Sequence, residues 1–192
     1  MTFLIQQTLI YAVPLMIVAL AGVFAERSGI INLALEGIMV FGAFIGVWFV
    51  RILQTSDAIL SLKQSGNWVA LQGVELLTML VAAAFGALFS LLLSFASINL
   101  RADQTIGGTA LNQFAPAFAV VMTWAIQGQG LTTIFIPNWV RITRDTFGLA
   151  PVDGPSFWNN LIFKYFYLTT PVAIVLFIAA YIVMYKTRFG LR

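Results

Sequence analysis

Five long apolar stretches constrain this chain more than any other feature of its sequence. They cover about residues 3–24, 29–50, 76–98, 107–126 and 165–185. A bilayer core is about 30 Å thick, so a helix that crosses it needs roughly 20 mostly apolar residues. The stretches are continuous rather than alternating at every second residue, which favours helices over the strands of a barrel. The sequence therefore predicts an all-α fold, a polytopic membrane helix bundle with about five transmembrane helices in one domain over residues 1–192.

The composition excludes several classes of function. Hydrophobic residues make up 60% of the chain and charged residues only 9%, whereas soluble proteins average roughly 25% charged residues. We therefore expect the lipid bilayer to surround this protein. The chain has no cysteine and no histidine, which excludes thiol nucleophiles, imidazole bases and metal sites built on either residue. The net charge of +3 is scattered along the sequence, and we expect neither a metal nor a nucleic acid as a ligand.

The sequence also lacks the motifs of common hydrolases. None of the three lysines, Lys63, Lys164 and Lys186, follows a glycine, so there is no G-x-x-x-x-G-K-[ST] phosphate loop. There is no H-E-x-x-H and no G-x-S-x-G either. We expect no catalytic residues, no cofactor bound by this chain and no ATPase activity of its own.

Two longer connections and the orientation are less constrained. Residues 52–75 are predicted to form a polar loop with room for a short surface helix, and residues 127–164, rich in Gly, Pro, Asn and Trp, to lie along the membrane surface. Suppose that the connections with Arg27 and Arg101 and the segment Lys186–Arg192 lie on the cytoplasmic side. Each side of the membrane then carries the same number of basic residues. The positive-inside rule therefore does not decide, although the short basic C-terminal end favours the cytoplasm.

The second stretch carries the one carboxylate that is predicted to lie well inside a span, Glu36. Asn32 lies four residues earlier and hence on the same face of the predicted helix. A carboxylate in hydrocarbon is costly, so such a residue usually faces a bundle interior or a water-filled path. We predict that Asn32 and Glu36 line a substrate pathway or gate, and the alternative is an interhelical hydrogen bond near the membrane interface.

Small residues indicate where helices approach each other. Gly42 and Gly46 form a G-x-x-x-G, and Ala82, Gly86, Ser90 and Ser94 recur at every fourth residue of the third stretch. Such spacing lets backbones come close. We expect these positions to serve helix packing, above all Gly42, Gly46, Gly86 and Ser90.

The fourth stretch opens with features unusual for a simple membrane anchor. Two adjacent glycines, Gly107 and Gly108, are followed by Asn112, Gln113 and Pro116. Irregular backbone at membrane depth is tolerated where it is buried or lines a cavity, and broken helices often mark the binding sites of transporters. The sequence therefore predicts a departure from regular helix near Gly107–Gly108 or Pro116, with an ordinary proline kink as the alternative.

The polar side chains of this stretch are candidates for contact with a substrate. We predict that Thr109 and Asn112 form one face toward the pathway, and that Gln113 is shared between that face and a helix contact.

Three segments resemble one family. Glu26–Met39, with the letters ERSGIINLALEGIM, resembles the ERSG-hydrophobic-hydrophobic-N-x-x-x-EG-x-M segment of the permease subunits of bacterial ABC importers for nucleosides and simple sugars. Gly107–Asn112 resembles the G-T-A-L-N at the start of a later span, and Lys186–Arg192 resembles the K-T-x-x-G lead-in. The nucleoside branch is the nearer one, because ribose-type permeases carry a G-I-D-L-S-x-G version of the first segment.

The resemblance implies a multi-component transporter. A second permease subunit shares the pathway, an ATPase subunit on the cytoplasmic side uses ATP, and an extracellular or periplasmic binding protein delivers the substrate. It also implies the bacterial plasma (inner) membrane, with the C-terminal end at its cytoplasmic face. Family members are longer and continue into a G-x-N-x-x-A-A coupling segment, so this chain resembles an N-terminal part of the ABC importer permease fold, with that segment expected beyond residue 192.

The sequence therefore predicts the permease of an ABC importer for a polar small molecule, a nucleoside above all. A sugar or branched-chain amino-acid ABC permease, an ion-coupled secondary carrier using Glu36, and a membrane scaffold without transport activity are the alternatives.

Overall fold

The computed structural model of the protein describes residues 2–29, 31–128, 130, 132–135, 140–142 and 166–187. Its helices are α1 (Thr2–Arg27), α2 (Leu35–Gln54), α3 (Asp57–Gln64), α4 (Trp68–Ile98), α5 (Gln104–Gln127) and α7 (Thr169–Lys186), and its strands are β1 (Arg141–Ile142) and β2 (Phe166–Tyr167). Five helices, namely α1, α2, α4, α5 and α7, are long and apolar enough to cross a membrane. The predicted number of spans and the helical fold class are confirmed.

The chain divides into two compact units, each described here by itself. The first unit comprises residues 1–20, 55–76 and 137–192, and the second comprises residues 21–54 and 77–136. In the first unit, α3 is the short helix predicted within residues 52–75, and Ser56 caps its first turn by accepting a hydrogen bond from the amide of Ile59. The strands β1 and β2 form an antiparallel ladder of two residues each, a small addition to the helical architecture.

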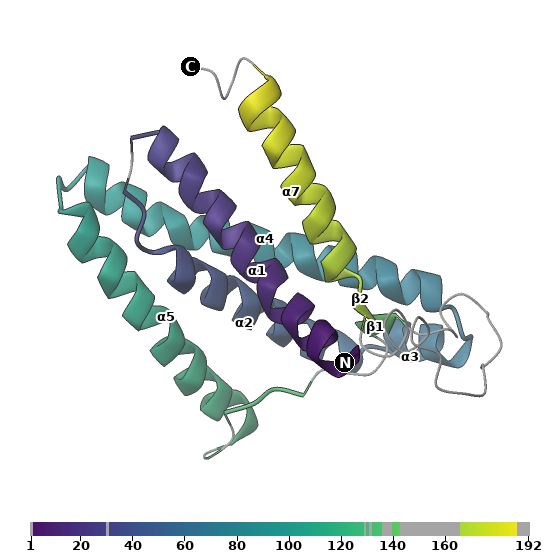
Figure 1. The fold of residues 1–192 in the computed structure, drawn as a ribbon. Coiled ribbons are helices and arrows are strands. Elements are labelled where there is room, and N and C mark those ends of the chain that lie inside the picture. Colours follow the sequence, from purple (N-terminus) through teal and green to yellow (C-terminus); the bar gives the residue numbers. More distant parts are fainter. Residues whose placement is uncertain are drawn as a thin grey trace. The chain divides into compact units, whose positions relative to one another are not determined.

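The second unit contains α2, α5 and the larger part of α4. Gly37 of α2 lies against Asn112 of α5, and Phe44 lies against Phe118 further along both helices, so α2 and α5 run parallel. Figure 1 shows these two helices side by side. This direction is the one expected of the second and fourth spans of a chain that crosses the membrane back and forth.

Helix α4 runs antiparallel to α2. A Cβ atom on Gly42 would lie 3.2 Å from the carbonyl oxygen of Ala82, and one on Gly46 would lie 3.2 Å from the Ala82 Cβ and 3.8 Å from the Thr78 side chain. Gly86, on α4, lies opposite Ile38. The small residues therefore lie where α2 and α4 approach most closely.

Aromatic rings from the three helices fill the space between them. The Phe41 ring of α2 stacks on the Phe89 ring of α4, with centroids 4.4 Å apart. On α5, Phe114 stacks on Phe118 at 5.6 Å, and Phe118 also meets Phe41 at 5.7 Å. Such ring pairs add about 0.5–1.5 kcal/mol each to the burial of their area, so this cluster is the apolar core of the second unit.

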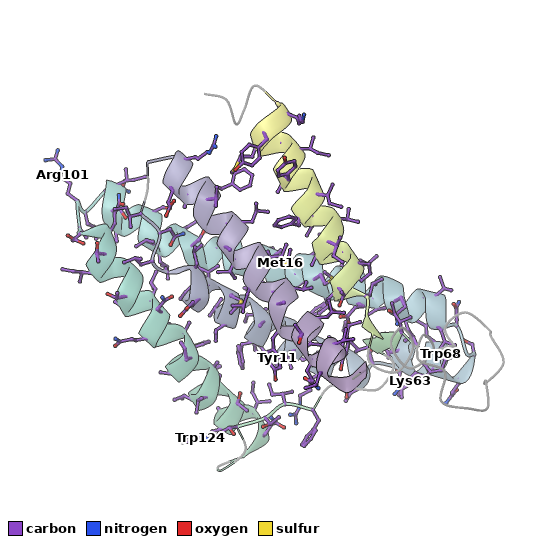
Figure 2. All side chains as sticks on the ribbon, in the orientation of Figure 1. Tyr11, Met16, Lys63, Trp68, Arg101 and Trp124 are labelled. Carbon is purple, nitrogen blue, oxygen red and sulfur yellow. The ribbon has the colours of Figure 1, made fainter. Side chains whose placement is uncertain are left out.

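Two labelled side chains mark the ends of α5. Arg101 projects from the connection between α4 and α5, and Trp124 lies in the last turns of α5 (Figure 2). The helix between them has 24 residues, and 20 of them would rise about 30 Å, the thickness of a bilayer core. Arg and Trp both favour the membrane–water interface.

The first turn of α5 is capped by Asp103. Its Oδ1 accepts hydrogen bonds from the amides of Thr105 at 2.7 Å and Ile106 at 3.2 Å. The hydrogen bonds from Ile106 and Thr105 hold the pKa of the exposed Asp103 carboxyl below its ordinary value, because they stabilise the charged form.

This cap predicts a pH-dependent contribution to stability. Since the folded-state pKa is lowered, the stabilisation is complete above the unfolded-state pKa of about 3.9 and is lost as the pH falls through the lower folded-state value. We expect Asp103→Ala to lower the melting temperature modestly at neutral pH, and the difference from the parent protein to shrink below roughly pH 4. Thermal melts from neutral to acidic pH measure it, and a constant difference would contradict this cap.

Several predicted boundaries need correction. The second helix begins at Leu35 rather than at residue 29, and α4 begins at Trp68 rather than at residue 76. The predicted break in the fourth span is wrong, because α5 is helical without interruption from Gln104 to Gln127, including Gly107–Gly108 and Pro116. The surface loop predicted over residues 127–164 lies largely outside the described residues.

Candidate functional site

The interrupted backbone lies between α1 and α2 rather than within α5. Helix α1 ends with the amides of Ser28 and Gly29 bonded to carbonyls of its last turn, and Gly29 takes the left-handed φ of +78°. Of the described residues that follow, Ile31–Ala34 are not helical, and the amide of Ile38 donates to the carbonyl of Ala34 at 2.9 Å as α2 begins. Residues 28–34, here called the connecting segment, therefore separate the two helices.

Helix α5 binds this segment with two amide side chains. Gln104 accepts a hydrogen bond from the amide of Ile31 at 3.1 Å. Asn112 donates through Nδ2 to the carbonyl of Leu33 at 2.5 Å, and its Oδ1 accepts from the amide of Gly37 at 2.6 Å. The first amides of a helix have no partner within it, so Asn112 caps α2 from a different helix.

Two glycines allow this close approach. A Cβ atom on Gly37 would lie 2.7 Å from the carbonyl oxygen of Leu111 and 3.0 Å from the Asn112 Cα. A Cβ atom on Gly108 would lie 2.9 Å from the Leu33 Cβ. Gly108 therefore serves close contact with the connecting segment, whereas a Cβ atom on Gly107 would lie 3.1 Å from the Leu93 side chain of α4.

Asn32 precedes α2, so the prediction that it shares a helix face with Glu36 is wrong. Its Oδ1 accepts a hydrogen bond from the amide of Ala34 at 3.0 Å, a turn that this residue type favours. The sequence held a signal for this arrangement. Gly29 is a typical helix stop, and an asparagine soon after it is a typical helix start.

Glu36 lies in the first turn of α2, and its side chain is exposed. The amino end of a helix carries partial positive charge, which stabilises a carboxylate there. At helical spacing, Glu36 shares one side of α2 with Val40, Ala43 and Val47.

On α5, Asn112 differs from Thr109 and Gln113 in the contacts that it makes. Asn112 makes the contact with α2, whereas Thr109 and Gln113 are exposed beside it. The Thr109 hydroxyl donates to the carbonyls of Thr105 and Ile106 in its own helix at 2.9 and 3.0 Å. Gln113 was predicted to be shared between the pathway face and a helix contact, and that role stays a prediction.

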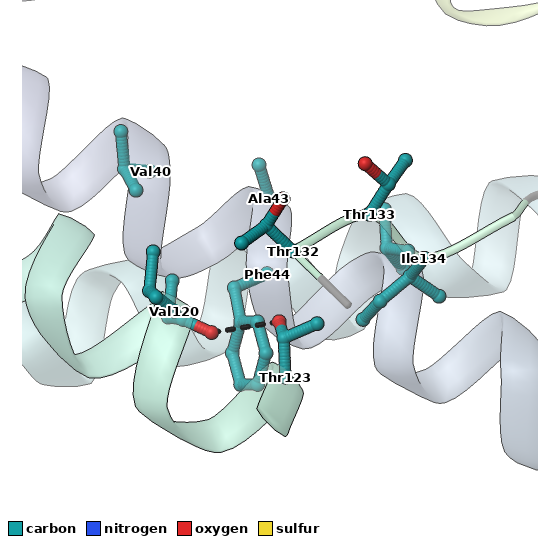
Figure 3. Close-up of a pocket in the computed structure, with 10 residues that line it drawn as sticks. Val40, Ala43, Phe44, Val120, Thr123, Thr132, Thr133 and Ile134 are labelled. Carbon is teal, nitrogen blue, oxygen red and sulfur yellow. Dashed lines mark hydrogen bonds between the residues drawn. The ribbon is translucent and has the colours of Figure 1, made fainter. Parts of the chain in front are cut away.

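A cavity of about 310 Å³ opens between α2 and α5. Figure 3 shows its lining, to which α2 contributes Val40, Ala43, Phe44 and Val47, α5 contributes Ala119, Val120 and Thr123, and the following chain contributes Thr132, Thr133 and Ile134. The Thr123 hydroxyl donates to the carbonyl of Ala119 at 2.7 Å. Gln127 donates to the carbonyl of Thr133 at 3.1 Å and so ties residues 132–134 to the end of α5.

The sides of the two helices that line this cavity also carry Glu36 and Asn112, which lie nearer the connecting segment and are not part of the cavity lining. Residues 36, 40, 43 and 47 of α2 and residues 112, 116, 119 and 123 of α5 have the same spacing, so each set lies on one side of its helix. Because the helices run parallel, Glu36 and Asn112 stand at one end of this surface, and Val47 and Thr123 stand at the other. We call it the α2–α5 groove.

The small residues fall into two groups. Gly42, Gly46 and Gly86 lie between α2 and α4, as described above. Ser90 donates to the carbonyl of Ala87 at 2.7 Å in its own helix and lines a second, polar cavity.

Glu75 is a buried carboxylate that sequence reasoning missed. It lies on α4, within the first unit, and only 6% of its surface is exposed. Leu71, Gln72 and Thr78 are also buried, and their spacing places them on the same side of the helix as Glu75. The signal was the unbroken run from Trp68 onward, which contains no proline and extends the apolar helix back through Glu75.

The whole chain matches known transport proteins. Residues 4–192 match the model of the family described as "Branched-chain amino acid transport system / permease component". The guanosine ABC transporter permease protein NupQ of Bacillus subtilis (strain 168) is 35% identical over 192 residues, which cover 100% of this chain and 54% of that protein. The nucleoside ABC transporter permease protein NupC of Lactococcus lactis subsp. cremoris (strain MG1363) is 37% identical over 98% of this chain and 54% of its own length.

A relative with lower sequence identity is named for a different substrate. The putative glucose ABC transporter permease protein TsgC13 of Haloferax volcanii is 26% identical over 98% of this chain and 50% of that protein. No solved structure matches the chain. The chain spans about half the length of the curated relatives that it matches. It is a multi-pass membrane protein, and it belongs to the family of branched-chain amino acid transport system permease components.

Proposed function

We propose that the chain is part of the permease subunit of an ABC importer, that its substrate is a nucleoside, and that the α2–α5 groove borders the translocation pathway. The observation that carries this proposal is the groove itself. Its cavity is lined by two parallel helices of membrane-spanning length, and helical spacing places Glu36 and Asn112 on the same sides of these helices as the lining. The names of the two relatives that match at 35% and 37% identity support the substrate class.

The groove suits an uncharged polar solute. Its apolar walls, formed by Val40, Val47 and Val120, can pack against a base, and the threonine hydroxyls at positions 123, 132 and 133 offer hydrogen-bonding groups. Ligand sites are commonly built in this way, with apolar walls and a few placed polar groups.

The same proposal includes the partners. ATP is consumed by a separate ATPase subunit, because no G-x-x-x-x-G-K-[ST] segment is present in this sequence. A second permease subunit completes the pathway, and an extracellular or periplasmic binding protein supplies the substrate. Lys186, at the end of α7, then lies on the cytoplasmic side of the bacterial plasma (inner) membrane.

The first test removes the charge at position 36. In the transporter assembled with its partners, Glu36→Gln should reduce guanosine uptake about tenfold, equivalent to about 1.4 kcal/mol, while membrane abundance stays normal. The reason is that a carboxylate at the end of the groove orients polar groups of the solute, whereas an amide keeps only the shape. The measurement is initial uptake of radiolabelled guanosine, with quantitative immunoblotting of the membranes.

Asp57→Asn is the matched control. Asp57 also occupies the first turn of a helix, α3, and is not among the residues that form the groove. If Glu36 only stabilised the first turn of α2, Glu36→Gln and Asp57→Asn would have the same effect on guanosine uptake, and the pathway assignment would be wrong. A carrier driven by protons would instead keep its uptake without ATP and lose it when the proton gradient is dissipated, and a sugar permease would take up glucose in preference to guanosine.

A further inference from the structure

A second cavity lies on the other side of the connecting segment. Its volume is about 180 Å³, and its lining comes from the end of α1, the connecting segment, α4 and α5. Ser28, Asn32, Ser90, Ser94, Ser97 and Gln104 contribute the polar lining, and Ala25, Leu93 and Ile98 complete it. All of these residues belong to the second unit.

The polar groups around this cavity are neutral. The hydrogen bonds that they already make determine which groups can still bind to them. The hydroxyls of Ser28, Ser90 and Ser97 donate to the carbonyls of Ala25, Ala87 and Leu93, three or four residues earlier in the chain, at 2.5 to 2.7 Å. Each of these oxygens therefore keeps lone pairs for a further donor.

The two amides present the opposite chemistry. The oxygens of Asn32 and Gln104 accept from the backbone amides of Ala34 and Ile31, so their NH₂ groups remain as donors. The lining contains no carboxylate for a cation and no positive charge for an anion. A molecule that both donates and accepts, and that carries no charge, fits this lining best.

The connecting segment needs such a molecule. Among the residues that the structure describes, the backbone amide of Asn32, a residue that lines this cavity, has no protein acceptor. A backbone group left unpaired within a membrane is costly, because hydrocarbon offers it no hydrogen-bond partner. Water is the partner that buried polar groups use when the protein supplies none.

We propose that this cavity is a hydration site that holds a cluster of ordered water molecules against the connecting segment. Its volume corresponds to about six water molecules at about 30 Å³ each. The water completes the hydrogen bonding of the non-helical backbone between α1 and α2. The site is separate from the α2–α5 groove and does not depend on which solute the protein transports.

Thiol chemistry tests whether the cavity is wet, and this cysteine-free chain suits the experiment. Ser94→Cys places a thiol on the cavity, and a hydrophilic methanethiosulfonate reagent reacts only with the thiolate, which needs hydrated surroundings. The control is Phe95→Cys, because Phe95 is exposed on α4, as Ser94 is, and lies at nearly the same depth, but it does not line the cavity. In membranes that contain the assembled transporter, we expect the Ser94→Cys variant to react at least about tenfold faster. Equal labelling rates would show that depth in the membrane alone determines the reactivity of the thiol, and they would overturn the proposal.

A filling substitution gives an independent result with a definite sign. Ser94→Val adds apolar volume to the cavity. If the cavity is dry, the added contacts raise the melting temperature. If it holds water that serves the backbone, the substitution displaces that water, and we expect the melting temperature of the purified protein to fall by several degrees. A rise would overturn the proposal even if the labelling result were positive.

Discussion

Gly37→Ala is expected to lower stability more than any other single added methyl group in the second unit. The new Cβ atom would lie 2.7 Å from the carbonyl oxygen of Leu111, which is backbone and cannot rotate away. Overpacking of this kind costs about 1–3 kcal/mol. The helices must also separate, and this weakens the bond between the Gly37 amide and Asn112. We expect a fall in melting temperature of several degrees, measured on the purified protein in detergent.

Gly73→Ala is the matched control for this prediction. Gly73 is also helical, on α4, but no atom lies within 4 Å of the position that its Cβ would take. Alanine is favoured over glycine within a helix by about 1 kcal/mol, so this variant should be as stable as the parent protein or more stable. If Gly37→Ala were equally well tolerated, the close approach of α2 and α5 would be wrong.

Asn112→Leu is expected to have the second large effect, and it acts on stability as well as on transport. The substitution leaves two backbone groups without their partner, the amide of Gly37 and the carbonyl of Leu33. Each unsatisfied group costs about 1–3 kcal/mol. The two hydrogen bonds indicate that this variant loses folding stability as well as uptake. The measurements are the melting temperature, for the effect on stability, and the initial rate of uptake, for the effect on transport, both on the same preparation.

Gln113→Leu provides the comparison for Asn112. It makes the same change of side chain one residue away, at an exposed position. We expect its melting temperature to remain near that of the parent protein, while uptake falls if Gln113 faces the solute. An Asn112→Leu variant that melted like the parent protein would show that the cap on α2 is dispensable.

Hydropathy was sufficient to predict the five spans, because the thickness of the bilayer sets the length of an apolar helix. It could not place the start of α2. Ile31, Leu33 and Ala34 are as apolar as the helix that follows them, and hydrophobicity reports where a residue lies, not the conformation of its backbone. The helix signals at Gly29 and Asn32 carried that information, but they are weak beside a continuous apolar run.

The candidate site was predicted in its residues but not in its arrangement. Asn112 and Glu36 stood out because polar side chains are rare in spans. That Asn112 bonds to Gly37 depends on a contact between residues 75 positions apart, and no local pattern specifies such a contact. The burial of Glu75 was missed for the same reason, since only packing by other segments distinguishes a buried carboxylate from one at a helix end.

The cap on α2 also bears on how the protein is assembled. Gly37 is synthesised well before Asn112, and all of α3 and α4 lie between them in the chain. When α2 first enters the membrane, its leading turn must rely on water or lipid head groups for the hydrogen bond that Asn112 later supplies. The early spans can therefore reach their final arrangement only after α5 has been inserted. Insertion of the fourth span thus completes the hydrogen bonding of the second span.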